Sequence, residues 1–186
     1  MRKALFVPSC RNVYLLCVAL CLSWTSSART DEKIVHVQLK QPAPYFILPT
    51  WDGNTLKSTA LKGKVVIMEF FQTWCPDCQK STLELEKLYQ KYKEKGLVVV
   101  AVSHDREKAE IVGPFVKKQG LTFPVLLGDH SIAMSYLGVT PQKPSFRIPY
   151  VVVIDREGDI VGQFEEGKRK EATDVDLLEE LVKKLF

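Results

Sequence analysis

The sequence predicts a single α/β domain in which helices flank a mixed central sheet and a β-hairpin forms an N-terminal extension. Three apolar runs rich in branched and aromatic residues are typical of strands buried on both faces, namely Val65–Phe71, Leu97–Ser103 and Tyr150–Ile154. Segments with helical spacing separate these runs. With 186 residues, 46% of them apolar, the chain is long enough for one well-buried core and short for two.

The first half of the domain contains the hairpin, a long strand and a long helix. Residues 45–48 and Thr55–Lys57 are extended pieces separated by strong turn residues at 51–54, which predicts the hairpin. After the first long strand, residues 75–95 carry apolar side chains at spacings of three and four. Gly96 is placed to end this helix.

The second half combines further helices with a closing hairpin. Helical patterns occur at residues 107–119, 131–137 and 174–184, and a short extended piece at 123–127. Gly113 and Pro114 interrupt the first of these helices, and we expect the proline to kink it or restart it because proline lacks an amide hydrogen. A turn at residues 156–159 joins the third long strand to an antiparallel partner at 160–164.

The first thirty residues predict an export signal. A basic start precedes an apolar run at residues 13–22, and small residues favour cleavage after Ala28. The run is shorter than the roughly 20 residues that span a bilayer, so a cleaved signal is favoured over an uncleaved membrane anchor, which is the alternative. A lipid-modified Cys21 is less favoured because bulky Leu20 precedes it. We expect a signal peptide at 1–28, a leader at 29–41 and the folded domain at 42–186, in the periplasm or another extracytoplasmic compartment.

The charge balance argues against a nucleic-acid partner. The formal net charge of +4 comes from 26 basic and 22 acidic residues. Arg2, Lys3 and Arg11 belong to the predicted signal, so 23 basic residues stand against 22 acidic ones in the rest of the chain. A nearly neutral surface has no basic footprint for nucleic acid.

Only two of the five cysteines lie outside the predicted signal, Cys75 and Cys78. A disulfide between them would close a very short loop and so constrain the unfolded chain little, which makes a structural role a poor explanation. A zinc site needs four ligands, and the chain beyond the predicted signal has no second pair of cysteines. We therefore expect a redox-active Cys75–Cys78 disulfide, no metal and no further cofactor.

The sequence Trp74-Cys75-Pro76-Asp77-Cys78 follows a buried strand and opens a helix. Free backbone donors and the positive end of the helix dipole favour a thiolate at this place, so Cys75 is the expected nucleophile and Cys78 the shielded resolving thiol. Glu69 lies six residues before Cys75 and is the one ionisable group in its strand. A buried carboxylate with a raised pKa would accept the proton of Cys78, although a buried acid without a part in turnover is the simpler alternative.

From about Pro42 to the C-terminus the chain resembles the thioredoxin superfamily, and within it the exported TlpA/ResA-like branch, which includes reductases of cytochrome c maturation. The resemblance is carried by residues 42–46, 63–66, 74–78, 123–127 and 148–155. It implies a thioredoxin-like fold and a protein-disulfide reductase.

The resemblance also implies roles for individual residues. Cys75 matches the attacking cysteine, Cys78 the resolving one, and Glu69 the buried acid. Pro149 matches the cis-proline that faces the disulfide, and the backbone of Ile148 is then expected to pair with an extended partner segment. Trp74 and Pro76, with Ile148 and Pro149, are the expected substrate-binding residues.

Asp77 between the cysteines places a negative charge that partly opposes the Cys75 thiolate, which favours a reductant over an oxidant. A reductant outside the cytoplasm needs an electron donor, so we expect a membrane-embedded thiol transporter as one partner. The other is an oxidised thiol protein, for which apocytochrome c is a candidate.

Two features of the sequence depart from the pattern of this branch. Several members carry a glutamate three residues after the second cysteine, where this chain has Ser81, so the acid–base role is assigned to Glu69 alone. Residues 140–147 lengthen the approach to Pro149. We expect this extra loop to lie near the dithiol and to select the partner.

Two other functions are compatible with parts of the sequence. A peroxidase of the peroxiredoxin type would need a Pro-x-x-x-Thr-x-x-Cys pattern, but Met68 and Gln72 occupy the proline and threonine positions before Cys75. A copper metallochaperone would hold the ion between the two thiolates, although copper-delivery relatives use a wider cysteine spacing and a histidine. His36, His104 and His130 are far apart in sequence, and only His104 is expected at the same sheet edge as the cysteines, where it would tune Cys75 or bind copper.

Overall fold

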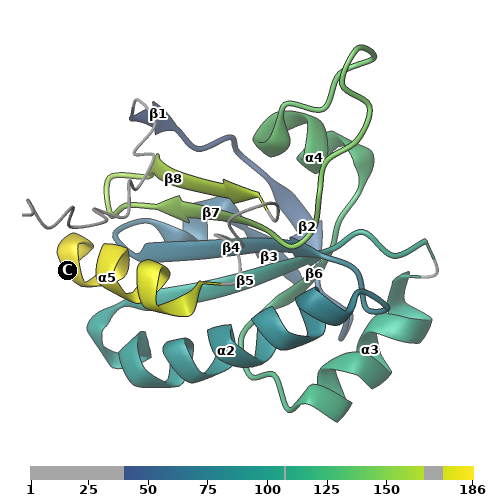
Figure 1. The fold of residues 1–186 in the computed structure, drawn as a ribbon, viewed down its shortest axis with the longest axis horizontal. Coiled ribbons are helices and arrows are strands. Elements are labelled where there is room, and N and C mark those ends of the chain that lie inside the picture. Colours follow the sequence, from purple (N-terminus) through teal and green to yellow (C-terminus); the bar gives the residue numbers. More distant parts are fainter. Residues whose placement is uncertain (1–39, 107, 166–173) are drawn as a thin grey trace, which may run out of the picture. The chain divides into compact units, whose positions relative to one another are not determined.

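A mixed six-stranded sheet forms the centre of the domain in the computed structural model, which describes residues 40–106, 108–165 and 174–186. The strand order is β1-β8-β7-β4-β5-β6 (Figure 1). The strands are β1 Gln41–Pro42, β4 Val65–Phe71, β5 Leu97–Ser103, β6 Val125–Leu127, β7 Tyr150–Ile154 and β8 Asp159–Glu165. β4, β5 and β6 are parallel, whereas β7, β8 and β1 join by antiparallel pairing. The predicted mixed sheet and the closing antiparallel pair are confirmed.

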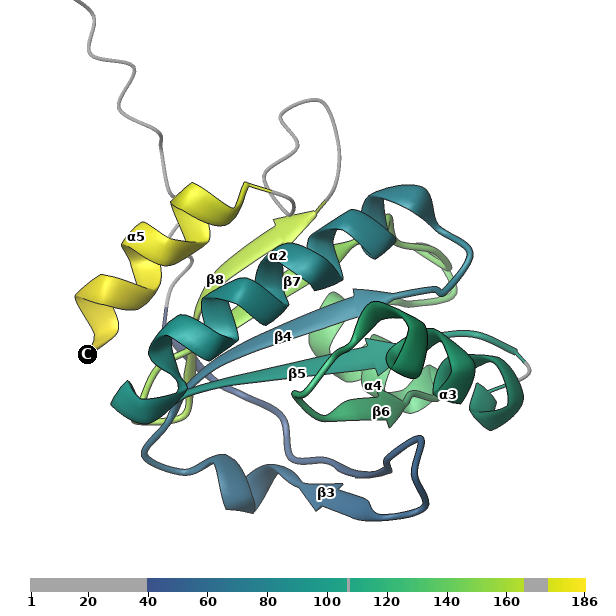
Figure 2. The same cartoon turned by 90° about the horizontal axis from the view of Figure 1, so that it is seen from below.

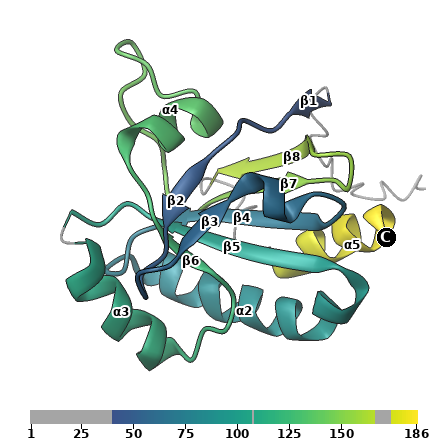
Figure 3. The same cartoon turned by 180° about the vertical axis from the view of Figure 1, so that it is seen from behind.

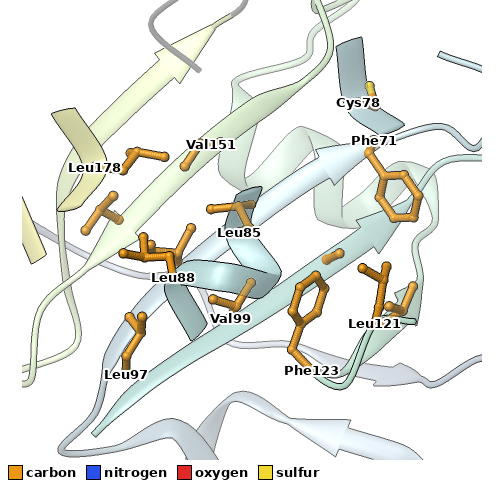
Figure 4. Close-up of a cluster of buried hydrophobic side chains, with 14 of the residues drawn as sticks. Phe71, Cys78, Leu85, Leu88, Leu97, Val99, Leu121, Phe123, Val151 and Leu178 are labelled. Carbon is orange, nitrogen blue, oxygen red and sulfur yellow. The ribbon is translucent and has the colours of Figure 1, made fainter. Parts of the chain in front are cut away.

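Helices cover both faces of this sheet, as predicted. The helices α2 Pro76–Tyr92, α3 Lys108–Gln119 and α5 Val175–Leu185 lie on one face, and α4 His130–Leu137 lies on the other (Figures 1 and 2). Side chains along β4 point alternately to the two faces of the sheet. Ile67 and Phe71 belong to the core under α2, whereas Met68 and Phe70 belong to the core under α4. Figure 4 shows the core under α2, with Cys78 and Phe71 at one end and Leu97 at the other.

The predicted hairpin is also present. β2 Ile47–Pro49 pairs antiparallel with β3 Thr55–Lys57, so that Leu48 lies opposite Leu56. A 3₁₀ turn at Ser58–Leu61 follows. The amide of Trp51 donates to the carbonyl oxygen of Val125 at 3.1 Å, which joins the hairpin to β6 (Figure 3).

The start of the sheet was not predicted. β1 includes Gln41, the last residue of the expected leader, and pairs it with Ile160 of β8. The ammonium group of Lys40 lies 2.8 Å from the carboxylate of Asp155, next to this pairing. The predicted signal peptide and residues 29–39 of the leader lie outside the described residues. Of the helices in the part of the chain that the structure describes, none is long and apolar enough to cross a membrane.

α3 does not restart at Pro114, which was one of the two expected effects of this proline. The structure has one continuous helix, with Pro114 inside it. Packing explains why the helix tolerates the missing amide: Val112 and Phe115 remain buried in the core under α2. Gly113 lets the ring of Trp51 come so close that a Cβ atom at this position would lie 3.1 Å from it. The predicted first residue of this helix, Glu107, lies outside the described residues.

The ends of the other helices agree closely with expectation. α2 ends at Tyr92 and continues as a 3₁₀ turn over Lys93–Lys95, and Gly96 ends it with a φ of 98°. The N-terminus of α4 is capped by Asp129, whose carboxylate accepts a hydrogen bond from the amide of Ile132 at 3.1 Å.

Candidate active site

The two cysteines lie where β4 passes into α2. Pro76 is the first residue of α2 and Cys75 is its N-cap, with extended backbone angles of −78° and 117°. Both cysteines are free thiols, and the amide of Cys78 donates a hydrogen bond to Cys75 Sγ at 3.3 Å. Cys75 is 7% exposed, whereas Cys78 is fully buried. A partner molecule can therefore reach Cys75 before it reaches Cys78, as the sequence predicts.

Glu69 lies on the face of β4 that is covered by α2. It is fully buried, between Ala101 of β5 and Val151 of β7 in the strand register. Within the described part of the chain, neither carboxylate oxygen has a hydrogen-bond partner of good geometry. Burial raises the pKa of Glu69 to about 8, and the Ser81 hydroxyl offsets this only in part.

The buried thiol and the buried carboxylate influence each other. Burial is the main reason that the pKa of Cys78 is raised, and its hydrogen bond with Cys75 and the negative charge of Glu69 raise it further. Ser81, three residues after Cys78, is buried as well. The site thus contains an outer thiol, an inner thiol and a carboxyl group that holds its proton near neutral pH.

The peptide bond between Ile148 and Pro149 is cis, as the resemblance implied. Pro149 is buried, and Ile148 packs against the apolar core to which both cysteines belong. Trp74, directly before Cys75, is 67% exposed, and Pro76 is exposed too. Trp74 and Pro76 are therefore open to contact with a partner.

The extra loop at residues 140–147 is anchored at the same edge of the sheet. The ring of Phe146 lies 5.4 Å from the imidazole of His104, which stacks on Phe70 at 5.7 Å. Thr140 and Lys143 exchange backbone hydrogen bonds of 2.9 and 3.0 Å, which closes the loop into a turn. The loop therefore has a defined fold and reaches the end of β4.

The histidines do not form a metal site in the described residues. His104 lies between aromatic rings at the cysteine edge of the sheet, whereas His130 is an exposed residue at the start of α4. His36 lies outside the described residues. No group of three or more histidine, cysteine, aspartate or glutamate side chains that could hold a metal ion occurs in the part that the structure describes.

Asp105 is a site residue that the sequence analysis missed. It is 3% exposed, directly follows His104, and accepts hydrogen bonds from the backbone and side chain of Thr73, two residues before Cys75. The available signal was an acidic residue just beyond the end of a buried parallel strand. Its partner was not evident because Thr73 is 32 positions away in the sequence.

The fold and the paired thiols at a helix start define a protein of the thioredoxin type. The sequence profile of the redoxin family matches residues 38–181. The chain is 30% identical to the thiol-disulfide oxidoreductase ResA of Bacillus cereus over 175 residues, which covers 94% of each chain. It is 35% identical to the ResA protein of Bacillus thuringiensis over 135 residues, 73% of this chain and 74% of that protein.

Solved structures lead to the same class. A thiol:disulfide interchange protein of the thioredoxin family from Chlorobium tepidum superposes with a TM-score of 0.65 at 29% identity, covering 80% of this chain and 97% of that one. The thioredoxin domain of a thiol-disulfide oxidoreductase from Bacteroides vulgatus gives a TM-score of 0.63 at 25% identity, covering 78% and 96%. The chain belongs to the redoxin family, in the TlpA/ResA-like branch of the thioredoxin superfamily. It is a thiol–disulfide oxidoreductase, which confirms the predicted fold and enzyme class.

Burial of Glu69 should make the stability of the protein depend on pH. The folded-state pKa of about 8 lies above the ordinary value of 4.5, so the native state keeps a proton that the unfolded chain loses between these pH values. Stability is fully present below the lower value and is lost as pH rises toward the upper one, by up to about 1.4 kcal/mol for each pH unit. In urea denaturation of the reduced protein, the free energy of unfolding of Glu69→Gln should increase relative to that of the wild type as pH rises from 5 to 8. The exposed control Glu94→Gln should not, and equal behaviour of the two variants would refute the assignment.

Proposed function

We propose that the protein reduces disulfide bonds of partner proteins outside the cytoplasm, with Cys75 and Cys78 as its redox pair. The observation that carries this proposal is the unequal burial of two neighbouring free thiols at the start of α2, next to a buried carboxyl group. One thiol is placed to meet a partner, and the other is placed to react only with the first.

The reaction begins when the Cys75 thiolate attacks one sulfur of the partner's disulfide. A new Cys75–partner disulfide forms, the old disulfide breaks, and the leaving sulfur takes up a proton. Cys78 then attacks Cys75 Sγ and releases the second partner sulfur as a thiol. Two electrons pass to the partner, and the protein ends with a Cys75–Cys78 disulfide.

The second step requires Cys78 to lose a proton although burial raises its pKa. Glu69 is the proton acceptor in this proposal. With a pKa of about 8 a minor fraction of it is deprotonated near neutral pH, and this fraction can take the proton of Cys78, at which its charge is felt. In the reverse step, re-reduction of the disulfide, the protonated Glu69 returns that proton.

The reducing direction and the partners rest on arguments from the sequence. The exposed Asp77 adds a negative charge between the cysteines, which disfavours the strongly oxidising behaviour that stabilised thiolates give. The predicted export signal places the reaction outside the cytoplasm. A membrane-embedded thiol transporter is then the electron donor, and an oxidised thiol protein, with apocytochrome c as a candidate, is the substrate.

The partner segment lies against Trp74, Pro76, Ile148 and Pro149 in this proposal. An extended chain that pairs with the backbone of Ile148 would bring its own disulfide next to Cys75. Backbone pairing is sequence-tolerant, so selection of the partner must come from neighbouring side chains and from the extra loop.

Trapping of the mixed disulfide tests the function. The full-length Cys78→Ser variant should accumulate partners linked to Cys75, because the resolving thiol is missing. Non-reducing electrophoresis should show adducts that disappear when dithiothreitol reduces them, and mass spectrometry should identify the partners. The double variant with Cys75→Ser should show none.

Three results, the first from the trapping experiment and two from separate assays of the purified protein, would contradict the proposal. The first is a complete lack of adducts when oxidised extracytoplasmic proteins are present. The second is rapid turnover of hydrogen peroxide by the purified protein, which would indicate the peroxidase alternative. The third is tight, stoichiometric Cu(I) binding without dithiol exchange, which would indicate the metallochaperone.

Glu69→Gln tests the proton transfer. When Cys75 is loaded with thionitrobenzoate, release of the chromophore measures the attack by Cys78. The wild-type rate should rise with pH with an inflection near pH 8, and Glu69→Gln should be slower by about 100-fold at pH 7. Ser81→Ala should move the inflection to higher pH, because the Ser81 hydroxyl lowers the pKa of Glu69. A wild-type pH profile in Glu69→Gln would exclude this role.

Phe146→Ala tests the role of the loop. Without the ring that contacts His104 and Phe70, the loop should lose its fixed position at the end of β4. Reduction of a trapped protein partner should slow several-fold, whereas reduction of a small aromatic disulfide should keep its rate. Met134→Ala, at an exposed position of α4, is the control. Equal loss of both activities would mean that the loop supports the fold and does not select partners.

A further inference from the structure

The position of Cys75 depends on the segment that precedes it. Cys75 is the N-cap of α2 and has extended backbone angles, so it lies outside the regular helix that holds Cys78. Its own amide donates to the carbonyl oxygen of Gln72 at 3.1 Å. The distance between the two sulfur atoms is therefore controlled by whatever fixes residues 72–74.

Asp105 binds this segment at Thr73. The amide of Thr73 donates to both carboxylate oxygens of Asp105, at 3.0 and 3.2 Å, and the Thr73 hydroxyl donates to Oδ1 at 3.0 Å. The hydroxyl of Ser103 donates to Oδ2 at 2.8 Å and so fixes the carboxylate on the end of β5. Asp105 is 3% exposed, which makes these bonds strong because water competes little.

Further hydrogen bonds fasten the residues around Thr73. The amide of His104 donates to the carbonyl oxygen of Phe71 at 2.9 Å, and the Gln72 side chain donates to the carbonyl oxygen of His104 at 3.0 Å. The Gln79 side chain donates to the carbonyl oxygen of Thr73 at 2.7 Å. Thr73 is thus held by its amide, its hydroxyl and its carbonyl group, between the end of β5 and the first turns of α2.

We propose that Asp105 is a positioning residue of the dithiol, which sets how readily Cys75 and Cys78 close their disulfide by holding Thr73 on the end of β5. This inference rests on the proposed redox function. A fixed loop keeps Cys75 Sγ close to Cys78 and raises the effective concentration of one thiol near the other. A loosened loop should leave the reduced form intact and weaken the disulfide.

A second buried aspartate provides a matched control. Asp155 is 4% exposed and accepts hydrogen bonds from the amides of Glu157 and Asp159 at 3.1 and 2.9 Å. Asp155 follows the end of β7 that pairs with the beginning of β4. Cys75 follows the other end of β4, so the two residues lie at opposite ends of the strands. Asp105→Asn and Asp155→Asn both replace a buried carboxylate by an amide, the second also removing the ion pair with Lys40. Only the loop of Asp105 leads to the dithiol.

The experiment equilibrates each purified full-length variant in thiol–disulfide buffers and measures the fraction of Cys75–Cys78 disulfide. For Asp105→Asn the equilibrium constant for closing the disulfide should fall roughly tenfold, equivalent to a potential less negative by about 30 mV. For Asp155→Asn it should stay at the wild-type value, even if the melting temperature falls equally in both variants. In Asp105→Asn, the mixed disulfide with a small thiol should also accumulate.

Thr73→Val separates positioning from charge and provides a milder change if Asp105→Asn does not fold. It removes the 3.0 Å bond from the hydroxyl to Asp105 and keeps the carboxylate charge. The equilibrium constant should fall about threefold, in the same direction. A shift in Asp105→Asn without any shift in Thr73→Val would mean that charge acts and would overturn the positioning role. Equal shifts in Asp105→Asn and Asp155→Asn would overturn it too, whereas a wild-type protein unable to exchange disulfides would instead refute the proposed function.

Discussion

β4 is hydrogen-bonded on both sides, to β5 and to β7, and is covered by helices on both faces. Every side chain of this strand is buried. The site depends on this placement, because one strand holds Glu69 away from water and also delivers Cys75 to the start of α2. A carboxyl group in such a position keeps its proton up to about pH 8, which it would not do at the surface. In the proposed mechanism this burial matters because it brings the pKa of Glu69 into the range needed for proton exchange with Cys78.

Most of the fold could be predicted from the sequence because its main strands are long apolar runs and its main helices have a clear apolar face. The failures occurred where distant contacts decide the local structure. β1 has two residues, and only pairing with β8 makes it a strand. Pro114 was expected to kink α3 or to restart it, and the helix does not restart because Val112 and Phe115 are buried around the proline. Local preference favours a break there, and tertiary packing overrides it.

The same distinction applies to the site. Cys75 and Cys78 were evident because they are neighbours at a strand–helix junction, and Glu69 was evident because it disturbs an apolar strand. Asp105 was not evident, because its meaning arises only when β5 ends beside β4 and brings Thr73 within 3.0 Å. The contact of Phe146 with His104 has the same origin, since the loop and the strand end are distant in sequence. Reactive residues that are close together in the sequence can be recognised there. The contacts that hold them in place depend on how distant segments meet in the fold.

The hairpin that joins β6 has a further consequence. A strand at the edge of a sheet exposes unpaired backbone groups that can template the pairing of another chain. β6 has only three residues, and the hairpin reaches it through the bond from Trp51 to Val125 and the bridge between Thr50 and Leu126. The hairpin therefore occupies part of the outer side of β6 and leaves fewer backbone groups there with which another chain could pair.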